Sequence, residues 1–305
     1  MPSAPTQKGK PQDFDSRTPR IAKLSSGIEL CYLEEGQGLP LVFIHGLLGD
    51  WRSWQPQWSA FLASGYRCIS YSRRYSFPNV NEIASTDHSV LVDADDLEGL
   101  LNVLGIPAAI LIGTSYGAFT ALAFAVHKPQ RAIALVATEA PMMKYADFSK
   151  EGAALRVEFE EKTEAAGRAF RRGNEEEAVR LMTEAINGSA PSSANTAIAL
   201  QRRVENANAM RALMMSVDPF PLLTPKQLQA ISAPTLLVVG ERTRPIHAAV
   251  FRNVCAAMPQ AHIAQVYGAG HGVHRDKPDD FNAIALRFLN SEIQTLPKTI
   301  PLETE

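Results

Sequence analysis

Ser115 carries the strongest chemical signal in this sequence, because it stands in the motif Gly113-Thr114-Ser115-Tyr116-Gly117 between an apolar run and an alanine-rich segment. This G-x-S-x-G spacing is typical of a sharp strand-to-helix turn. A serine there adopts a strained backbone, and the glycines remove side chains that would collide. The following helix directs free N–H groups toward the same point, which favours a developing negative charge. The motif predicts a nucleophile; a glycine-softened turn with a surface serine is the alternative.

A histidine is the usual base for a serine hydroxyl, which is a weak nucleophile by itself. Among seven histidines, His271 lies in the run YGAGHGVHRDKPDDF, after the last expected strand and before the closing helix. This position predicts a loop at the carboxyl edge of the sheet, where Ser115 also lies. His274 is the rival, but glycines flank His271 and give it the freer approach, so we expect His271 to be the base.

A candidate oxyanion hole follows the run LVFIH, which ends at His45 and opens into residues 46–50. We expect the imidazole of His45 to brace this loop beside the serine turn. The backbone N–H groups of Leu47 and Tyr116 would then bind the oxyanion, with Leu48 as the alternative donor.

Short apolar runs alternate with helix-period segments from residue 21 onward, which predicts an α/β chain with a parallel sheet. Residues 21–24 and 28–33, around Ser25-Ser26-Gly27, predict a hairpin that leads into the sheet. The other expected strands are nearly continuous in apolar residues, as in a sheet covered on both faces. They are residues 41–45, 66–71, 108–113, 132–137, 235–239 and 262–267.

A helical cap is predicted over residues 141–230, where strand signals disappear and windows rich in Ala, Glu, Arg and Met replace them. The core would then comprise residues 21–140 and 231–292, with a flexible tail over residues 1–20 and a second tail over residues 293–305.

Two helices within this cap have clear ends in the sequence. One should begin after Asn174 as N-cap and end at Gly188. Another should begin at Thr224, with Gln227 completing a capping box.

Composition excludes several classes of protein. The chain has 305 residues, of which 46% are hydrophobic and 20% charged, as expected for a globular protein with a large core. Its net charge of −2 gives no general attraction to nucleic acid or an anionic membrane, and no apolar run is long enough to span a bilayer. Three widely spaced cysteines predict neither a disulfide framework nor a zinc site. We expect a cytoplasmic protein, monomer or homodimer, with a small-molecule substrate.

These motifs together resemble the α/β-hydrolase family. The resemblance covers roughly residues 21–292 and rests on HGLLG, GTSYG, PTLLVVGE and GAGH in this order. It implies a mostly parallel eight-stranded sheet flanked by helices, with an inserted helical cap and no metal or organic cofactor. It also implies Ser115 as nucleophile and His271 as general base.

The acid of the expected triad departs from the commonest pattern of that family. Many members place it three residues after the glycine that ends the PTLLVVG-type strand, where this chain has Thr243. Haloalkane dehalogenases and their relatives instead carry the acid after the strand that follows the nucleophile helix, which here gives Glu139 in ALVATEAPMM. We expect Glu139 to orient His271, with Glu241 as competitor and a degenerate site as the remaining possibility.

Substrate contacts are predicted from residues near the loop and in the cap. Trp54 follows the oxyanion loop, and six of eight methionines, including Met142 and Met143, fall in the cap. Flexible thioethers suit an adaptable apolar pocket, although core packing is the alternative for both residue types. Arg73-Arg74 is interpreted as a solvated loop, with a carboxylate clamp as the alternative.

The sequence therefore predicts a serine hydrolase that acts on a small, largely apolar ester, thioester, lactone or activated C–C bond through an acyl-enzyme. A serine nucleophile excludes the related reactions that begin with an aspartate. Two alternatives remain: a receptor-like member that binds a ligand without turnover, and a cofactor-free oxygenase of the same fold.

Overall fold

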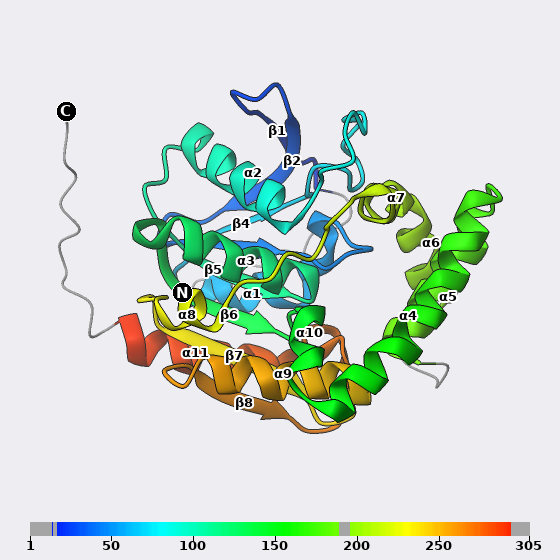
Figure 1. Cartoon of the computed structure of the whole chain (residues 1–305). Helices are drawn as coiled ribbons and strands as arrows, with labels where there is room; N and C mark the ends of the chain where they lie inside the picture. Colours follow the sequence, from blue (N-terminus) through cyan, green and yellow to red (C-terminus); the bar gives the residue numbers. More distant parts are fainter. Residues whose placement is uncertain (1–13, 15–16, 189–195, 294–305) are drawn as a thin grey trace, which may run out of the picture.

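A single eight-stranded sheet forms the centre of the computed structural model, which describes residues 14, 17–188 and 196–293 (Figure 1). The strand order is β1-β2-β4-β3-β5-β6-β7-β8; β2 pairs antiparallel with β1 and β4, and the other pairs are parallel. The strands are β1 Arg20–Lys23, β2 Glu29–Glu35, β3 Pro40–Ile44, β4 Arg67–Tyr71, β5 Ala109–Thr114, β6 Ala132–Thr138, β7 Thr235–Gly240 and β8 His262–Val266. Every predicted strand and the predicted hairpin are confirmed within about two residues.

Helices cover both faces of this sheet, which explains why its central strands β3, β5, β6 and β7 are mostly apolar on both faces. Successive side chains of a strand point to opposite faces. On β3, Val42 and Ile44 belong to the core under α2 (Val90–Val103) and α3 (Tyr116–His127), whereas Leu41 and Phe43 belong to the core on the other face.

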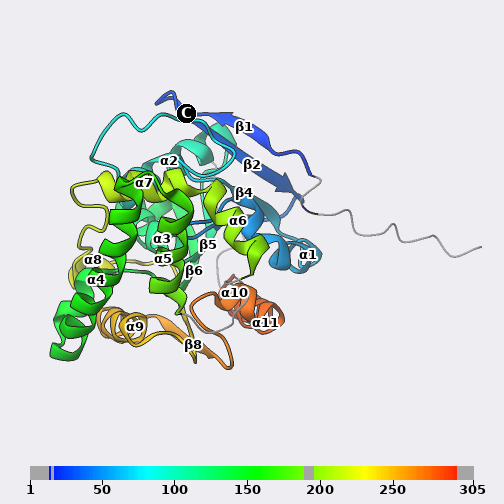
Figure 2. The ribbon, with the colours of Figure 1, turned by 90° about the vertical axis from the view of Figure 1, so that its right-hand side faces the viewer.

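The second face is covered by α1 (Gln55–Ala63) and α11 (Pro278–Ile293). Figure 2 shows these two helices on one side of the sheet and α2, α3 and α9 (Pro245–Ala257) on the other. The short helices η2 (Trp51–Trp54), η3 (Pro129–Arg131) and α10 (Val273–Asp276) lie in the connections.

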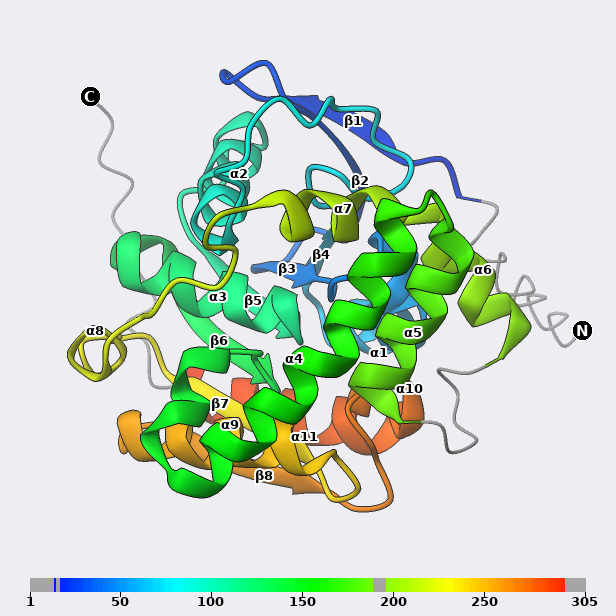
Figure 3. The ribbon, with the colours of Figure 1, turned by 45° about the vertical axis from the view of Figure 1, so that its right-hand side comes forward.

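The described residues between β6 and β7 form helices and connecting loops but no strand. The helices are η4 Met143–Phe148, α4 Lys150–Arg171, α5 Glu175–Asn187, α6 Ala197–Glu205, α7 Ala207–Met215 and α8 Pro225–Gln229. Figure 3 shows α4 and α5 side by side in front of the strand ends. Both predicted helix starts are confirmed: the Asn174 side chain accepts from the N–H of Glu177, and Thr224 and Gln227 form a capping box.

The first residues correct one expectation. Phe14 lies in the predicted flexible tail, yet it is buried, with its ring 5.4 Å from each of the rings of Trp51 and Trp58. Arg17 forms an ion pair with Glu35. An aromatic side chain at this position closes the face of the sheet under α1, so ordered structure begins before β1. Residues 1–13, 15–16 and 294–305 of the two predicted tails lie outside the described residues.

The topology brings the ends of six strands to one edge. Strands β3 to β8 all run parallel, so the residues that follow them gather at their carboxyl ends, where open α/β sheets bind ligands. Among the described residues, no helix combines the length and apolarity needed to cross a membrane.

Candidate active site

Ser115 occupies the bend between β5 and α3 with a backbone that L-residues rarely adopt. Its φ is 51° and its ψ is −124°. A Cβ on Gly113 would lie 2.3 Å from the carbonyl oxygen of Gly117, and one on Gly117 would lie 2.1 Å from that of Ile44. Both positions therefore require glycine, as the motif predicts. The strained turn is held by a hydrogen bond of 2.8 Å from the Ser115 N–H to the carbonyl of Thr138.

His271 and Glu139 form a buried pair at the same edge. The distance from His271 Nδ1 to Glu139 Oε2 is 2.7 Å, although the two residues are separated by 132 positions. Glu139 also has a positive φ, 46°, which turns its side chain back across the end of β7. There the N–H of Gly240 donates to Glu139 Oε1 at 2.8 Å.

The chemistry of this pair is that of an oriented base. Burial alone would raise the pKa of Glu139, but the hydrogen bonds that its carboxylate accepts, among them those from His271 and Thr243, keep the pKa below its ordinary value, so the carboxylate is ionised. An ionised carboxylate only accepts hydrogen bonds, so Nδ1 of His271 carries the proton. Nε2 of His271 is buried without a hydrogen-bond partner among the described residues. It is therefore the nitrogen able to accept a proton.

Thr243 and Glu241, the two other residues considered for the position of the acid, make different contacts. The hydroxyl of Thr243, at the commoner family position, donates to Glu139 Oε2 at 2.6 Å. Glu241 turns away and accepts from the N–H of Gly268 at 2.8 Å. The carboxylate that meets His271 is that of Glu139, and Thr243 binds it.

His274 lies on the far side of the loop that carries His271. It is buried with its ring 4.7 Å from that of Trp54, and burial lowers its pKa well below the ordinary value. Gln57 donates to its backbone carbonyl at 2.7 Å. His274 is therefore packed into the core beside α1, whereas His271 meets Glu139.

The loop over residues 46–50 is braced as predicted. Nδ1 of His45 is 2.8 Å from the carbonyl oxygen of Gly46, and its Nε2 accepts from the N–H of Arg73 at 2.9 Å. Full burial lowers the pKa of His45 to about 3, so the imidazole is neutral and Nδ1 donates. A Cβ on Gly46 would lie 3.3 Å from Cβ of Ser115, which shows how closely the loop approaches the turn that carries Ser115.

The two predicted oxyanion donors flank this approach. Leu47 and Tyr116 both line the apolar cavity at Ser115, and Leu47 and Leu48 both line the neighbouring crevice, which also reaches Ser115. Neither the N–H of Leu47 nor that of Tyr116 donates a hydrogen bond within the described part of the chain. Both are available to a ligand oxygen.

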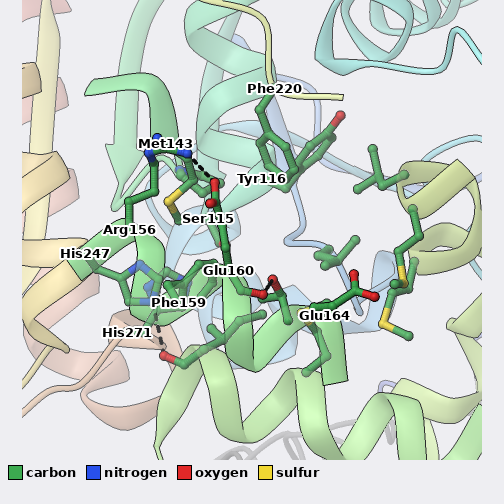
Figure 4. Close-up of a pocket in the computed structure, with 18 residues that line it drawn as sticks. Ser115, Tyr116, Met143, Arg156, Phe159, Glu160, Glu164, Phe220, His247 and His271 are labelled. Carbon is green, nitrogen blue, oxygen red and sulfur yellow. Dashed lines mark hydrogen bonds and ion pairs between the residues drawn. The ribbon is translucent and has the colours of Figure 1, made fainter. Parts of the chain in front are cut away.

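A mostly apolar cavity of about 290 Å³ opens above these residues. Figure 4 shows the imidazoles of His247 and His271 together on one wall and the rings of Tyr116 and Phe220 on another. Its other walls combine aliphatic and thioether side chains, among them Met143, Met182, Met210, Leu213 and Met214, with polar side chains of α4, namely Arg156, Glu160, Thr163 and Glu164. A cavity of this size and polarity suits a small apolar ligand group.

The comparisons with known proteins decide the family. A model described as the alpha/beta hydrolase family matches residues 41–284. This chain belongs to that family. An sn-1-specific diacylglycerol lipase of Mus musculus is 27% identical to this hydrolase over 260 residues, which cover 82% of this chain and 80% of the relative. The 2-hydroxy-6-oxo-6-phenylhexa-2,4-dienoate hydrolase of Comamonas testosteroni is 25% identical over 293 residues, 90% of this chain and 97% of the relative.

Solved structures agree on the fold. A carboxylesterase structure from Nitrososphaera gargenis superposes with a TM-score of 0.73 at 18% identity, covering 91% of this chain and 100% of the other. A bromoperoxidase from Bacillus anthracis gives a TM-score of 0.72 at 21% identity, covering 90% and 100%. At such identities the likeness establishes the α/β-hydrolase fold and nothing finer.

Two predicted substrate contacts of this hydrolase need correction. Trp54 is fully buried with its ring 4.9 Å from that of Phe43, and it does not line the cavity. Met142 is buried in the core and also lies outside the cavity wall. Both side chains close the space between elements of the fold. Met143 lines the cavity, and its contact with a substrate stays a prediction.

The interpretation of Arg73-Arg74 as a solvated loop is wrong. Arg73 is buried and pairs with Asp93 at 2.7 Å, and Arg74 pairs with Asp96 at 2.6 Å. The guanidinium of Arg73 also donates toward the carbonyls of Gly46 and Leu47 at 3.3 and 3.4 Å. The carboxylates that the two arginines bind are therefore those of Asp93 and Asp96 on α2. The contacts of Arg73 with the loop of residues 46–50 hold that loop in place.

His247 is the residue of the site that sequence reasoning missed. It lies in the first turn of α9, and its ring stacks on that of His271 with 4.3 Å between centroids. Its Nε2 is 3.1 Å from the carbonyl oxygen of Ile186, and burial lowers its pKa to about 3, so it is a neutral partner. The only available signal was its position just after β7, beside Thr243.

Proposed function

We propose that this hydrolase cleaves a small, largely apolar ester, thioester, lactone or activated C–C bond by a serine-nucleophile mechanism. The observation that carries the proposal is the buried pair of His271 and Glu139, with the unpartnered Nε2 of His271 on the wall of the cavity that also contains Ser115.

The first half of the reaction forms an acyl-enzyme. Ser115 Oγ attacks the carbonyl carbon while Nε2 of His271 takes the hydroxyl proton. Glu139 stabilises the resulting imidazolium through Nδ1 without itself becoming protonated. The backbone N–H groups of Leu47 and Tyr116 donate to the oxyanion, each contributing about 2.7–4 kcal/mol in the transition state. When the tetrahedral intermediate collapses, His271 returns the proton to the leaving group.

The second half regenerates the enzyme. A water molecule gives a proton to His271 and attacks the acyl carbon, and the second collapse returns the proton to Ser115 Oγ and releases the carboxylic acid. The relatives support both bond classes, because their names specify a diacylglycerol lipase and a hydrolase of an oxo-dienoate.

Hydrolysis is favoured over ligand binding alone by Glu139. The receptor-like alternative was motivated by Thr243, which cannot supply a carboxylate. Since Glu139 supplies one at 2.7 Å from His271, the motivation for lost turnover disappears.

The test compares the wild-type chain with Ser115→Ala on 4-nitrophenyl butyrate and on the 2-hydroxy-6-oxo-6-phenylhexa-2,4-dienoate named for the relative. We expect a burst of nitrophenolate in the wild type and its loss in Ser115→Ala, by a factor of about 10³ or more in kcat. Mass spectrometry after a serine-reactive phosphonate should find the adduct on Ser115. Equal turnover in Ser115→Ala would remove the nucleophile and the mechanism.

A further inference from the structure

The crevice beside the loop of residues 46–50 is a second space that reaches Ser115. Its volume is about 60 Å³, and it is lined by Thr183 and His274 as well as by Ser115 and His271. Ser115 and His271 also line the apolar cavity. These two residues therefore lie where the cavity and the crevice meet.

The cap helix α5 faces both spaces with neighbouring residues. Met182 lines the apolar cavity, Thr183 lines the crevice, and Ile186 lines both. Successive residues of a helix point about 100° apart, so one turn can present an apolar and a polar side. The end of α5 is held against the core, because Arg244 and His247 of the α9 start lie 2.5 and 3.1 Å from carbonyl oxygens of its last turn. Thr183 is thereby fixed beside the loop of His271.

Three buried side chains of the crevice carry polar atoms without a hydrogen-bond partner among the described residues. These atoms are Oγ1 of Thr183, Nε2 of His271 and both ring nitrogens of His274. The three residues are 5%, 7% and 2% exposed. A buried polar group without a partner is unfavourable, and ordered water is a common way to satisfy it.

The crevice has the size and the chemistry of a water site. At roughly 10–15 Å³ for each water, a volume of about 60 Å³ holds about four water molecules. A buried water also needs two to four polar partners. The hydroxyl of Thr183 donates and accepts, Nε2 of His271 accepts, and the neutral ring of His274 offers one donor and one acceptor.

The crevice also connects to the surface. It adjoins an outer space of about 200 Å³, and Gly49 and Ser53 are among the residues that line both. The outer space is bordered by the exposed residues Gln55 and Ile198. Water can therefore reach Ser115 by this route while an acyl group fills the apolar cavity.

We propose that the crevice supplies the water that hydrolyses the acyl-enzyme and that the hydroxyl of Thr183 positions this water. The inference rests on the proposed function, because it requires an acyl group on Ser115. Thr183 accepts a hydrogen bond from the water, whose other proton passes to Nε2 of His271 while its oxygen bonds to the acyl carbon. The bond from that carbon to Ser115 Oγ then breaks, and the proton returns to Oγ. Thr183 is thus a positioning residue for the second half of the reaction.

The first test measures the two halves of the reaction separately. Thr183→Val keeps the shape of the side chain but removes the hydroxyl. Quenched-flow mass spectrometry with 4-nitrophenyl butyrate follows how fast butyryl-enzyme forms on Ser115 and how fast it decays. We expect formation to be unchanged in Thr183→Val and decay to slow about tenfold, because one hydrogen bond to the attacking water is lost. Thr183→Ser restores the hydroxyl and should restore the decay.

A matched control removes a buried hydroxyl elsewhere. Thr235, at the start of β7, is buried and donates to the carbonyl of Ala233 at 2.9 Å. Thr235→Val should change neither formation nor decay of the butyryl-enzyme. Thr183→Ala replaces Thr183→Val if a thermal melt shows that the valine variant does not fold. Equal decay in the wild type and in the folded variant without the hydroxyl would overturn the proposal.

The second test distinguishes a lost water contact from a displaced His271. Benzyl alcohol accepts an acyl group by the same proton transfer to His271, but its aromatic ring suits the apolar cavity. Thr183→Val should therefore slow hydrolysis and not this transfer, so the ratio of benzyl butyrate to butyrate should rise about tenfold. If both rates fell together, Thr183 would act on His271 or on the fold, and the proposal would be wrong. If no butyryl-enzyme formed even in the wild type, the proposed function itself would fail, and this inference with it.

Discussion

The hydroxyl of Thr243 donates a hydrogen bond of 2.6 Å to Oε2 of Glu139, and the same oxygen accepts one from Nδ1 of His271. The position that commonly carries the acid in this family therefore holds a hydrogen-bond donor for the acid. The carboxylate of this chain lies at the end of β6, the strand that pairs with β7, and meets the imidazole of His271 there.

Exchange of Thr243 tests this relation. Thr243→Val keeps the shape but removes one hydrogen bond to an ionised group, so we expect kcat/KM for 4-nitrophenyl butyrate to fall about tenfold, equivalent to about 1.5 kcal/mol. Thr243→Ser restores the hydroxyl and should restore activity. A wild-type rate in Thr243→Val would show that the hydroxyl does not position Glu139.

Glu139→Gln should lower kcat by about 10⁴, because the amide cannot stabilise an imidazolium or enforce the Nδ1–H tautomer of His271. Glu241→Gln is the matched control and should leave kcat within about twofold, since its contact is with the N–H of Gly268. If Glu241→Gln lost activity while Glu139→Gln kept it, Glu241 would be the acid that orients His271 in place of Glu139.

Position 243 allows a test of whether a second carboxylate can restore activity. In a Glu139→Gln chain, Thr243→Asp places a carboxylate back at the end of β7, and we expect kcat to recover by about tenfold or more over Glu139→Gln alone. Steady-state kinetics on one ester measures this. No recovery, in a double variant whose melting temperature equals that of the single variant, would mean that position 243 is not interchangeable with position 139.

His247 should make the stability of the hydrolase depend on pH. Its pKa is lowered from 6.5 to about 3 in the folded chain, so the unfolded state binds a proton below pH 6.5 that the folded state refuses. Stability is fully present above pH 6.5 and is lost as the pH falls toward 3. Between pH 6 and 4, the free energy of unfolding of the wild type should fall with decreasing pH. His247→Phe should reduce this slope by about 1.4 kcal/mol per pH unit, measured by urea titration at several pH values.

The exposed His127, at the end of α3, is the control for this measurement. His127→Gln should leave the slope unchanged. A slope that is equal in the wild type and in His247→Phe would mean that His247 titrates normally in the folded chain.

The pair of Arg73 and Asp93 should stabilise both the fold and the loop of residues 46–50. Its side chains are 3% and 1% exposed, so Arg73→Gln leaves a buried carboxylate without its cation and should cost about 3–5 kcal/mol of unfolding free energy. The surface exchange Arg252→Gln should cost less than about 1 kcal/mol. Equal losses in urea unfolding would contradict the structural role of Arg73.

The amino-acid sequence by itself determined the elements and the nucleophile turn. Apolar runs of strand length, Gly113 and Gly117 around Ser115, and the caps at Asn174 and Thr224 act over a few residues, so their structure can be predicted locally. The contact of His45 Nδ1 with the carbonyl of Gly46 belongs to the same class, because it joins neighbouring residues, whereas the contact of its Nε2 with Arg73 does not.

Only the tertiary structure decided which distant side chains meet. Whether Glu139 or Glu241 reaches His271 depends on the backbone turn after β6 and on its pairing with β7, neither of which a local pattern contains. Trp54, Arg73 and His247 were misjudged or missed for the same reason. Their environments are made by segments far away in the chain, namely α11, α2 and the loop of His271, and burial by a distant segment leaves no periodic trace in the sequence around them.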